Sequence, residues 1–324
     1  MNFFWAFIIF CLSCTGSFVF AQNQKSDKDL YTSYLKGFFS AEDGNFRAAL
    51  EELEKVKKAD PKSIYIRLKI ASLLIRLGEL DKAEKELKEA KTLDTESFDA
   101  SLALVFLYSY AQKDSELEKE YEDFLKRAHK VKPDDIKISQ YLAQFYFYKK
   151  QPQEALKIYE AILKKNPNDV EGVFWLGYIY DELGKREDAV KMWRKALEID
   201  PSHGLSLNSL GYVYAQEGKN LEEAEKMILK ALEKEPENGA YLDSLGWVYF
   251  KKKNYKKAEE YLKKAINCQD DPVIYEHLGD LYAELDDSKA ALNYYTVGLS
   301  KFPDNKVLKN KLERYGKENK TSKN

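Results

Sequence analysis

The side chains best suited to acid–base or metal chemistry are few and scattered. The three histidines, His129, His203 and His277, lie about 74 residues apart, and none has a second His or a Cys at metal-ligand spacing. Zinc and related metals need three or four converging ligands, so we expect no metal site. Two of the three cysteines fall within the first fourteen residues, which leaves Cys268 alone downstream and excludes a disulfide-stabilised scaffold.

Motifs for nucleotide binding and hydrolysis are also missing. The sequence contains no Gly-x-Gly-x-x-Gly, Gly-x-Ser-x-Gly or Gly-x-x-x-x-Gly-Lys-Ser/Thr run. We therefore assign no catalytic residue and expect no cofactor. Lys+Arg 52 against Asp+Glu 54 leaves a net charge of −2, so the long-range attraction to phosphate backbones is absent and a nucleic-acid partner is not expected.

The composition favours exposed helices. Hydrophobic residues make up 44% of the 324 residues, enough to bury a core, and 33% are charged. Glycine and proline are scarce, while alanine, glutamate, lysine and leucine are frequent. An all-α fold is predicted.

A short motif recurs four times in the C-terminal half. A Leu-Gly pair precedes Tyr178, Tyr212, Trp247 and Asp280, and the leucines are spaced by 34, 35 and 33 residues. Two further columns keep the same register: Ala189, Ala224, Ala258 and Ala291, and Pro133, Pro167, Pro201 and Pro236. Three columns in phase predict tandem copies of one structural unit.

This pattern resembles the tetratricopeptide repeat, whose signature combines Leu-Gly, Tyr, Ala, an aromatic residue and Pro over 34 residues. The resemblance implies an α-solenoid, a right-handed superhelix in which each repeat is a pair of antiparallel helices. Laid along the chain, the period gives eight repeats over residues 30–305. They begin near residues 30, 64, 98, 136, 170, 204, 239 and 272.

The remaining segments complete the predicted organisation. Residues 22–29 are expected to be a linker, 306–316 a capping helix over the last apolar face, and 317–324 a disordered tail. The third repeat carries about four extra residues around 111–114, which are expected to lengthen its turn. Gly177, Gly211, Gly246 and Gly279 are expected where two helices approach closely, because a larger side chain would push them apart.

The resemblance also places a groove. In this family the first helix of each repeat lines the concave face, chiefly through its second, fifth, ninth and twelfth residues. Five of the eight ninth positions are aromatic here, whereas the family usually has a small polar residue. We expect a partner-binding groove, aromatic along much of its length and acidic toward its C-terminal end, formed by Tyr34, Phe38, Phe106, Phe147, Phe174, Tyr178, Asn208, Tyr212, Asp243, Trp247, Phe250 and Glu276.

Other interpretations of these side chains stay open. The rings could instead pack against each other between adjacent repeats, and the acidic residues could form an ordinary solvated face. Some tetratricopeptide proteins grip a carboxylate with Lys, Asn and Arg, but the fifth positions of the regular repeats contain no Lys. A neutral or cationic partner is therefore favoured over an anionic one.

The first residues resemble a secretion signal. No charged residue occurs from Phe3 to Phe20, and Val19 and Ala21 are small residues of the kind that precede a signal-peptidase cut. We expect residues 1–21 to be a signal peptide, with the uncleaved segment 3–20 as a membrane anchor in a second interpretation. A third has Cys14 lipidated. Each predicts an exported protein in the periplasm.

Three functions are compared on this basis. We favour a non-catalytic scaffold of the bacterial cell envelope that binds peptides or envelope proteins in the aromatic groove. The segments at residues 207–212 and 242–247, Leu-Asn-Ser-Leu-Gly-Tyr and Leu-Asp-Ser-Leu-Gly-Trp, look like those of bacterial envelope tetratricopeptide proteins. The alternatives are a polysaccharide-binding guide in an export apparatus, since rings stack on sugar faces, and, least favoured, an enzyme.

Overall fold

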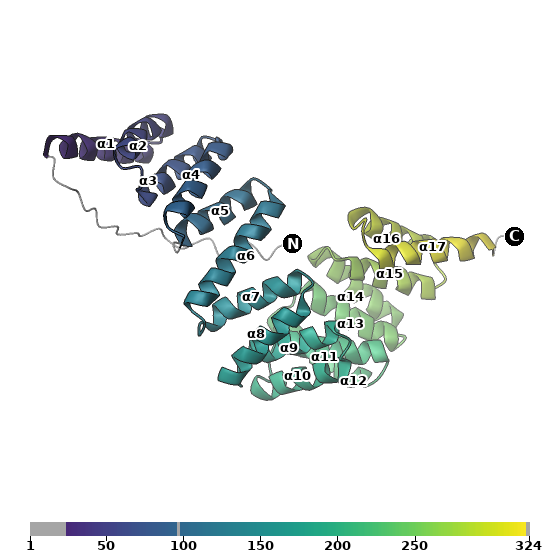
Figure 1. The fold of residues 1–324 in the computed structure, drawn as a ribbon. Helices are drawn as coiled ribbons and strands as arrows, with labels where there is room; N and C mark the ends of the chain where they lie inside the picture. Colours follow the sequence, from purple (N-terminus) through teal and green to yellow (C-terminus); the bar gives the residue numbers. More distant parts are fainter. Residues whose placement is uncertain (1–23, 96–97, 322–324) are drawn as a thin grey trace. The chain divides into compact units, whose positions relative to one another are not determined.

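The computed structural model describes residues 24–95 and 98–321, and within them every regular element is an α-helix (Figure 1). The described residues form seventeen helices, arranged as eight successive antiparallel pairs and a final helix. This confirms the predicted all-α solenoid and its capping helix. The chain folds as two compact units that divide after Leu142: unit 1, residues 1–142, and unit 2, residues 143–324.

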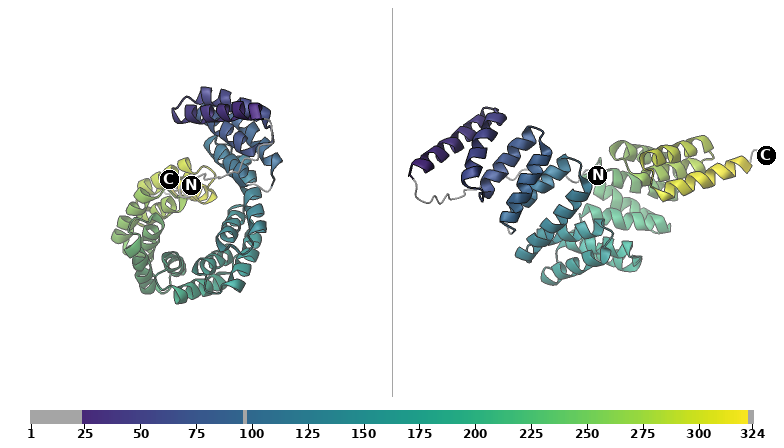
Figure 2. Two further views of the ribbon diagram at one scale, coloured as in Figure 1. Left: turned by 90° about the vertical axis from the view of Figure 1, so that its left-hand side faces the viewer. Right: turned by 45° about the horizontal axis from the view of Figure 1, so that its top comes forward.

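Unit 1 contains three helix pairs and most of α7. Its helices are α1 Gln24–Glu42, α2 Phe46–Ala59, α3 Ile64–Arg76, α4 Leu80–Leu93, α5 Phe98–Tyr110, α6 Asp114–Val131 and α7 Ile136–Tyr148, which crosses the division. Within the unit the pairs stack side by side (Figure 2).

Unit 2 continues with the same plan. Its helices are α8 Pro152–Lys165, α9 Val170–Glu182, α10 Arg186–Ile199, α11 Gly204–Glu217, α12 Leu221–Lys234, α13 Gly239–Lys251, α14 Tyr255–Cys268, α15 Pro272–Glu284, α16 Ser288–Lys301 and α17 Lys306–Thr321. The first helices α11, α13 and α15 pair with their own second helices. In addition, α11 contacts α13, and α13 contacts α15.

The turn inside each helix pair has one shared geometry. Each of the eight described turns contains a residue with a positive φ between 54° and 76°, which ends the first helix and turns the chain back, and the turn between α11 and α12 contains a second one, Asn220, at 49°. Glycine occupies this place at Gly44, Gly78, Gly184 and Gly218, where a left-handed conformation is unstrained. Short polar caps then start many helices: Asn254 accepts a hydrogen bond from the amide of Lys257 at the start of α14.

Two boundaries differ from the sequence expectation. α1 begins at Gln24, inside the segment 22–29 that was expected to be a linker, because this polar run contains no proline or glycine to stop a helix. α17 runs to Thr321, so residues 317–321 of the expected disordered tail are helical for the same reason. The predicted signal peptide, residues 1–21, lies outside the described residues.

The extra residues of the third repeat lengthen a helix and not a turn. The turn at residues 111–113 is as short as its counterparts, whereas α6 has 18 residues against 14 in the second helix of each of the other pairs. The four extra residues add about one helical turn to α6. Because a helix has 3.6 residues per turn, the apolar side chains after the insertion stay on the same face of α6.

The predicted close approach of paired helices is present at the glycine column. A Cβ atom on Gly211 would lie 2.8 Å from Cγ1 of Ile228, and one on Gly246 would lie 2.7 Å from Cγ of Leu262. At Gly177 and Gly279 the obstacles are the rings of Trp193 and Tyr295. Large side chains of each second helix therefore fill the space that glycine leaves on the first.

The capping helix closes the last of these interfaces. Leu308 of α17 is fully buried, in a cluster with Tyr275 and Tyr295, and Tyr315 meets the Tyr295 ring edge-on at 6.1 Å. Lys311 donates to both carboxylate oxygens of Asp280, at 2.7 and 2.6 Å. α17 thus covers apolar surface that a ninth repeat would otherwise cover.

We predict that Gly211→Leu destabilises unit 2 by about 1–3 kcal/mol or more, because the added side chain collides with Ile228. Denaturant unfolding followed by circular dichroism measures the effect. Glu217→Leu places the same residue at an exposed position of α11 and should have little effect. Adding Ile228→Ala to Gly211→Leu should recover part of the loss. Equal stability of Gly211→Leu and the parent would refute the close-approach role.

Candidate functional site

The twelve residues predicted to line one groove fall into two sets. Tyr34, Phe38 and Phe106 belong to unit 1, and the other nine belong to unit 2. Each set lies on the first helices of its repeats, as the resemblance implied.

In unit 1 two rings remain open. Phe38 of α1 and Phe106 of α5 each expose 42% of their surface. Tyr34 is half-buried, and its hydroxyl lies 3.0 Å from the hydroxyl of Tyr65 on α3. Burial and this hydrogen bond raise the pKa of Tyr34 to about 12. This face of unit 1 is therefore aromatic, and the raised pKa keeps the Tyr34 phenol neutral at physiological pH.

The first part of unit 2 combines packed and open rings. Phe147 of α7 meets Tyr178 of α9 at 5.4 Å between ring centroids, and Phe174 lies 6.2 Å from Tyr178. Phe174 and Tyr178 differ in exposure. Phe174 is buried and also contacts the His203 ring, whereas Tyr178 exposes as large a fraction of its surface as Phe38 does. Phe174 thus supports Tyr178 and presents little surface of its own.

Carboxylates surround the exposed ring of Tyr178. Its pKa is raised, first by burial and then by the negative charges of Glu182, Asp181 and Asp271. Asp181 is itself ion-paired, with Nε of Arg186 at 2.7 Å from its Oδ1. The surroundings of this ring therefore favour a positive charge nearby.

Trp247 is less open than predicted because two rings stack on it. Phe250 lies on it at 4.6 Å and 11°, and His277 at 4.0 Å and 12°. The indole is only 9% exposed, and the ammonium of Lys251 lies 4.8 Å from its ring centroid. Here the alternative of packing between repeats applies, since Trp247 belongs to α13 and His277 to α15.

Asp243, predicted to be an acidic groove residue, is buried in a pair with His277. Its two carboxylate oxygens lie 2.9 and 3.0 Å from Nδ1 of the imidazole, and the two residues are 6% and 4% exposed. The sequence alone predicts no partner for His277. The signal that it missed is the separation of 34 residues, one repeat, between the two positions.

Asn208 and Tyr212 lie one turn apart on the same face of α11. The Tyr212 ring is 6.2 Å from the His277 ring. Burial, then Asp243 and Glu276, raise the pKa of Tyr212 to about 12 against smaller lowering effects of Gln216 and Arg186. Oδ1 of Asn208 is buried and makes no hydrogen bond within the described residues.

The predicted acidic end is partly neutralised by the capping helix. Lys311 lies 3.5 Å from Glu276 and 2.6 Å from Asp280. Asp243 is engaged with His277. The C-terminal end of this face is therefore less acidic than the sequence alone predicts.

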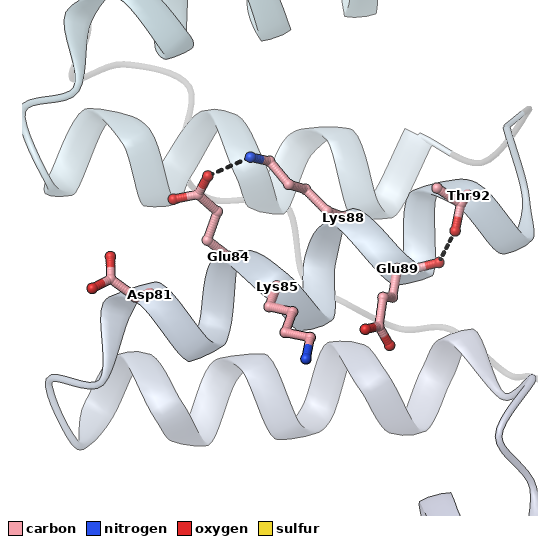
Figure 3. Close-up of a pocket in the computed structure, with 6 residues that line it drawn as sticks. All are labelled: Asp81, Glu84, Lys85, Lys88, Glu89 and Thr92. Atoms are coloured by element: carbon pink, nitrogen blue, oxygen red, sulfur yellow. Dashed lines mark hydrogen bonds and ion pairs between the residues drawn. The ribbon is translucent and has the colours of Figure 1, made fainter.

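Shallow hollows also lie away from the predicted groove residues, one on α4 and one between α1 and α2. A shallow hollow of about 410 Å³ on α4 is lined by six residues of that one helix, most of them charged (Figure 3). Glu84 there is paired with Lys88 and Lys113. In residues 24–95 and 98–321 no group of three acidic, His or Cys side chains could hold a metal ion, and no helix is long and apolar enough to cross a membrane.

We predict a specific acid sensitivity at Glu84. Hydrogen bonds from Lys113 and Lys88 hold its pKa at about 2, below the ordinary value of 4.5. Because the folded pKa is depressed, the pairing stabilises the fold fully above about pH 4.5 and is lost as the pH falls toward 2. Urea unfolding of Glu84→Gln should show lower stability than the parent at pH 7 and a smaller decrease between pH 7 and pH 3. Equal decreases would contradict this assignment.

We also predict that Asp243→Leu costs roughly 1–3 kcal/mol of stability, because it leaves the buried Nδ1–H of His277 without an acceptor. Asp243→Asn keeps an oxygen acceptor in nearly the same volume and should cost less. Guanidinium unfolding of both variants makes the comparison. Equal losses would mean that the hydrogen bond contributes no more than the packing.

Comparison with known proteins identifies the repeats. A tetratricopeptide-repeat model matches residues 40–108, and a model of the N-terminal tetratricopeptide region of Psidin matches residues 149–265. No curated protein matches the chain in a search of whole sequences.

The search of solved structures also returns similar chains, of which the first described here has a TM-score above 0.5. A chain of the APC/C hetero-tetramer Cut9–Hcn1 aligns at 19% identity with a TM-score of 0.56. The alignment covers 83% of this chain and 52% of that one, so this chain spans about half the length of that protein. A tetratricopeptide-repeat protein from Parabacteroides merdae aligns at 15% identity over 89% and 99% of the chains, with a TM-score of 0.47. A thermophilic one from Thermus thermophilus aligns at 24% identity over 56% and 97%, with a TM-score of 0.49.

Three observations agree: the repeat period, the glycine contacts inside the helix pairs, and the family models that match residues 40–108 and 149–265. The chain is a tetratricopeptide-repeat protein.

Proposed function

We propose that this chain is a non-catalytic scaffold of the bacterial cell envelope, which binds peptides or proteins on the first-helix faces of its repeats. The observation that carries the proposal is the exposure of three ninth-position rings, Phe38, Phe106 and Tyr178, each with 42% of its surface exposed. Aromatic side chains supply much of the energy of protein interfaces because they bury a large area at a small cost in rotamer entropy.

The two units offer different surfaces to a partner. Unit 1 presents Phe38 and Phe106 with no carboxylate among the predicted groove residues, whereas in unit 2 the open ring of Tyr178 lies among carboxylates. A partner that uses both surfaces would place apolar side chains on unit 1 and a neutral or basic segment on unit 2. Tetratricopeptide repeats in general are interaction scaffolds, which supports the class of function.

We place the scaffold outside the inner membrane, in the periplasm. The support is the uncharged run from Phe3 to Phe20, together with Val19 and Ala21, which lie three residues and one residue before the expected cleavage point. Cleavage before Gln22 would release the chain, retention of residues 3–20 would anchor it, and lipidation of Cys14 would tether it. Fractionation and intact-mass measurement of the cellular protein distinguish these forms.

The proposed binding surface is tested by in-cell crosslinking and co-purification. We expect the parent to capture a discrete set of envelope proteins and the variant Phe38→Ala/Phe106→Ala/Tyr178→Ala to lose them, because the exposed surfaces of the three rings are removed. The variant must match the parent by circular dichroism and unfolding.

Tyr110→Ala/Tyr148→Ala is the matched control. These tyrosines are more exposed, at 63% and 81%, but lie at the ends of α5 and α7 outside the ninth position. Loss of capture only in the ninth-position variant supports the proposal. Unchanged capture in that variant would rule out these faces, and displacement of the captured proteins by soluble oligosaccharides would favour the polysaccharide-binding role instead.

A further inference from the structure

The helix pair α1–α2 stands at one end of unit 1 (Figure 1). In later repeats the third position of the first helix contacts the preceding repeat. A Cβ atom on Gly204 of α11 would lie 2.8 Å from the Tyr241 hydroxyl of α13, and one on Gly298 of α16 would lie 3.0 Å from Leu308 of α17. Among the described residues no repeat precedes α1, so the corresponding face of α1 has no covering helix.

Three positions on this side of the first helices show the difference. The third, seventh and tenth positions lie about one turn apart on one face. On α3 and α5 they are all buried, as Ile66, Ile70, Leu73, Ala100, Leu104 and Leu107. On α1 they are exposed, as Thr32, Lys36 and Phe39. Threonine and lysine suit contact with water, whereas Phe39 leaves 59% of an apolar side chain in water that burial would stabilise.

A hollow lies beside Phe39 between α1 and α2. Its volume is about 420 Å³. We call the surface around it the open face of unit 1, formed chiefly by Thr32, Leu35, Lys36, Phe39, Ala48 and Glu51. The Phe39 ring meets the Phe38 ring edge-on, with 5.6 Å between the centroids, and this contact helps to hold its orientation. The open face thus carries both a projecting aromatic ring and a space that can receive one.

The open face also carries one unpaired charge of each sign. Lys36 of α1 and Glu51 of α2 are exposed, and neither forms an ion pair within the described residues. A Cβ atom on Gly37 would lie 3.0 Å from Leu53 and 3.3 Å from the carbonyl oxygen of Ala49. This level of α1 therefore faces the stretch of α2 that contains Glu51, so the two charges lie at the same height on different helices.

We infer that the open face of unit 1 binds the open face of a second copy of the chain around a two-fold axis. An axis parallel to the helices places α1 of each copy opposite α2 of the other. Phe39 of each copy then enters the hollow of the other, and Lys36 of each lies opposite Glu51 of the other. A two-fold interface requires a surface that complements itself, and the ring with its hollow and the cation with its anion meet that requirement.

A dimer of this kind carries every binding surface of the chain twice. A partner with two binding segments is then held at two places, which raises its apparent affinity without a new contact. Phe39 occupies the tenth position and is not one of the ninth-position rings in the proposed partner surface. Dimerisation and partner capture are therefore tested separately.

Sedimentation equilibrium of the purified cellular chain tests the association, in detergent where residues 1–21 are retained. We expect a reversible monomer–dimer equilibrium with a dissociation constant in the micromolar range, because one helix pair offers a small interface. Phe39→Glu should weaken dimerisation at least tenfold, on the scale of an interface anchor, since it removes the ring and brings a charge into the hollow. Tyr110→Glu changes a similarly exposed ring of α5 and should leave the equilibrium unchanged.

Charge reversal tests the two-fold arrangement. Lys36→Glu and Glu51→Lys should each weaken the dimer, because each places like charges opposite one another at both contacts. An equimolar mixture of the two variants should associate as strongly as the parent, since the heterodimer again pairs opposite charges at both contacts. Mixing would not recover a loss that came from damage to the fold of either variant.

A parent that stays monomeric up to millimolar concentration overturns the inference, and so does a dimer that Phe39→Glu leaves unchanged. Failure of the mixture to restore association refutes the pairing of Lys36 with Glu51 across a two-fold axis. If a monomeric parent binds vesicles of phosphatidylethanolamine and phosphatidylglycerol through Phe39, the open face contacts a lipid surface and the dimer is wrong. None of these outcomes decides the proposed function, which the capture experiment tests.

Discussion

The close approach of the two helices in each pair is the constraint on which the structure depends. In five of the eight pairs a glycine, such as Gly211 or Gly246, stands at the eighth position of the first helix, where a large side chain of the second helix fills the space. Because the eighth position faces the second helix, the neighbouring ninth position turns away from the pair. The inner faces of unit 1 and of unit 2 are thus set by packing, before any ligand is considered.

Equivalent positions on these faces still have different roles, and the next repeat decides which. Tyr178 and Trp247 both follow the conserved spacing of the Leu-Gly motif, yet Tyr178 is exposed and Trp247 is nearly buried. The difference is His277, one repeat after Asp243, which covers one side of the indole while Phe250 covers the other. A solenoid stabilised by nearest-neighbour contacts can therefore vary its surface one repeat at a time without changing its path.

Much of the fold was predictable because it depends on local, periodic signals. The period, the glycine column and the prolines located eight helix pairs and the capping helix, and the two longest misjudged segments, at Gln24 and Thr321, contain no residue that stops a helix. The site was less predictable. The Asp243–His277 pair joins the fifth residue of one repeat to the sixth of the next, so columns compared one at a time do not reveal it.

Buried polar side chains of unit 2 differ in whether they are paired, and the difference bears on stability. A buried oxygen such as Asn208 Oδ1 without a donor costs about 1–3 kcal/mol, and a leucine of similar size would avoid that cost. His277 shows the opposite case. Its ring stacks on Trp247 at 4.0 Å, and the buried carboxylate of Asp243 lies 2.9 Å from its Nδ1. The carboxylate supplies the hydrogen-bond partner that the buried nitrogen needs, so an imidazole can occupy a place between repeats where an unpaired polar ring would weaken the fold.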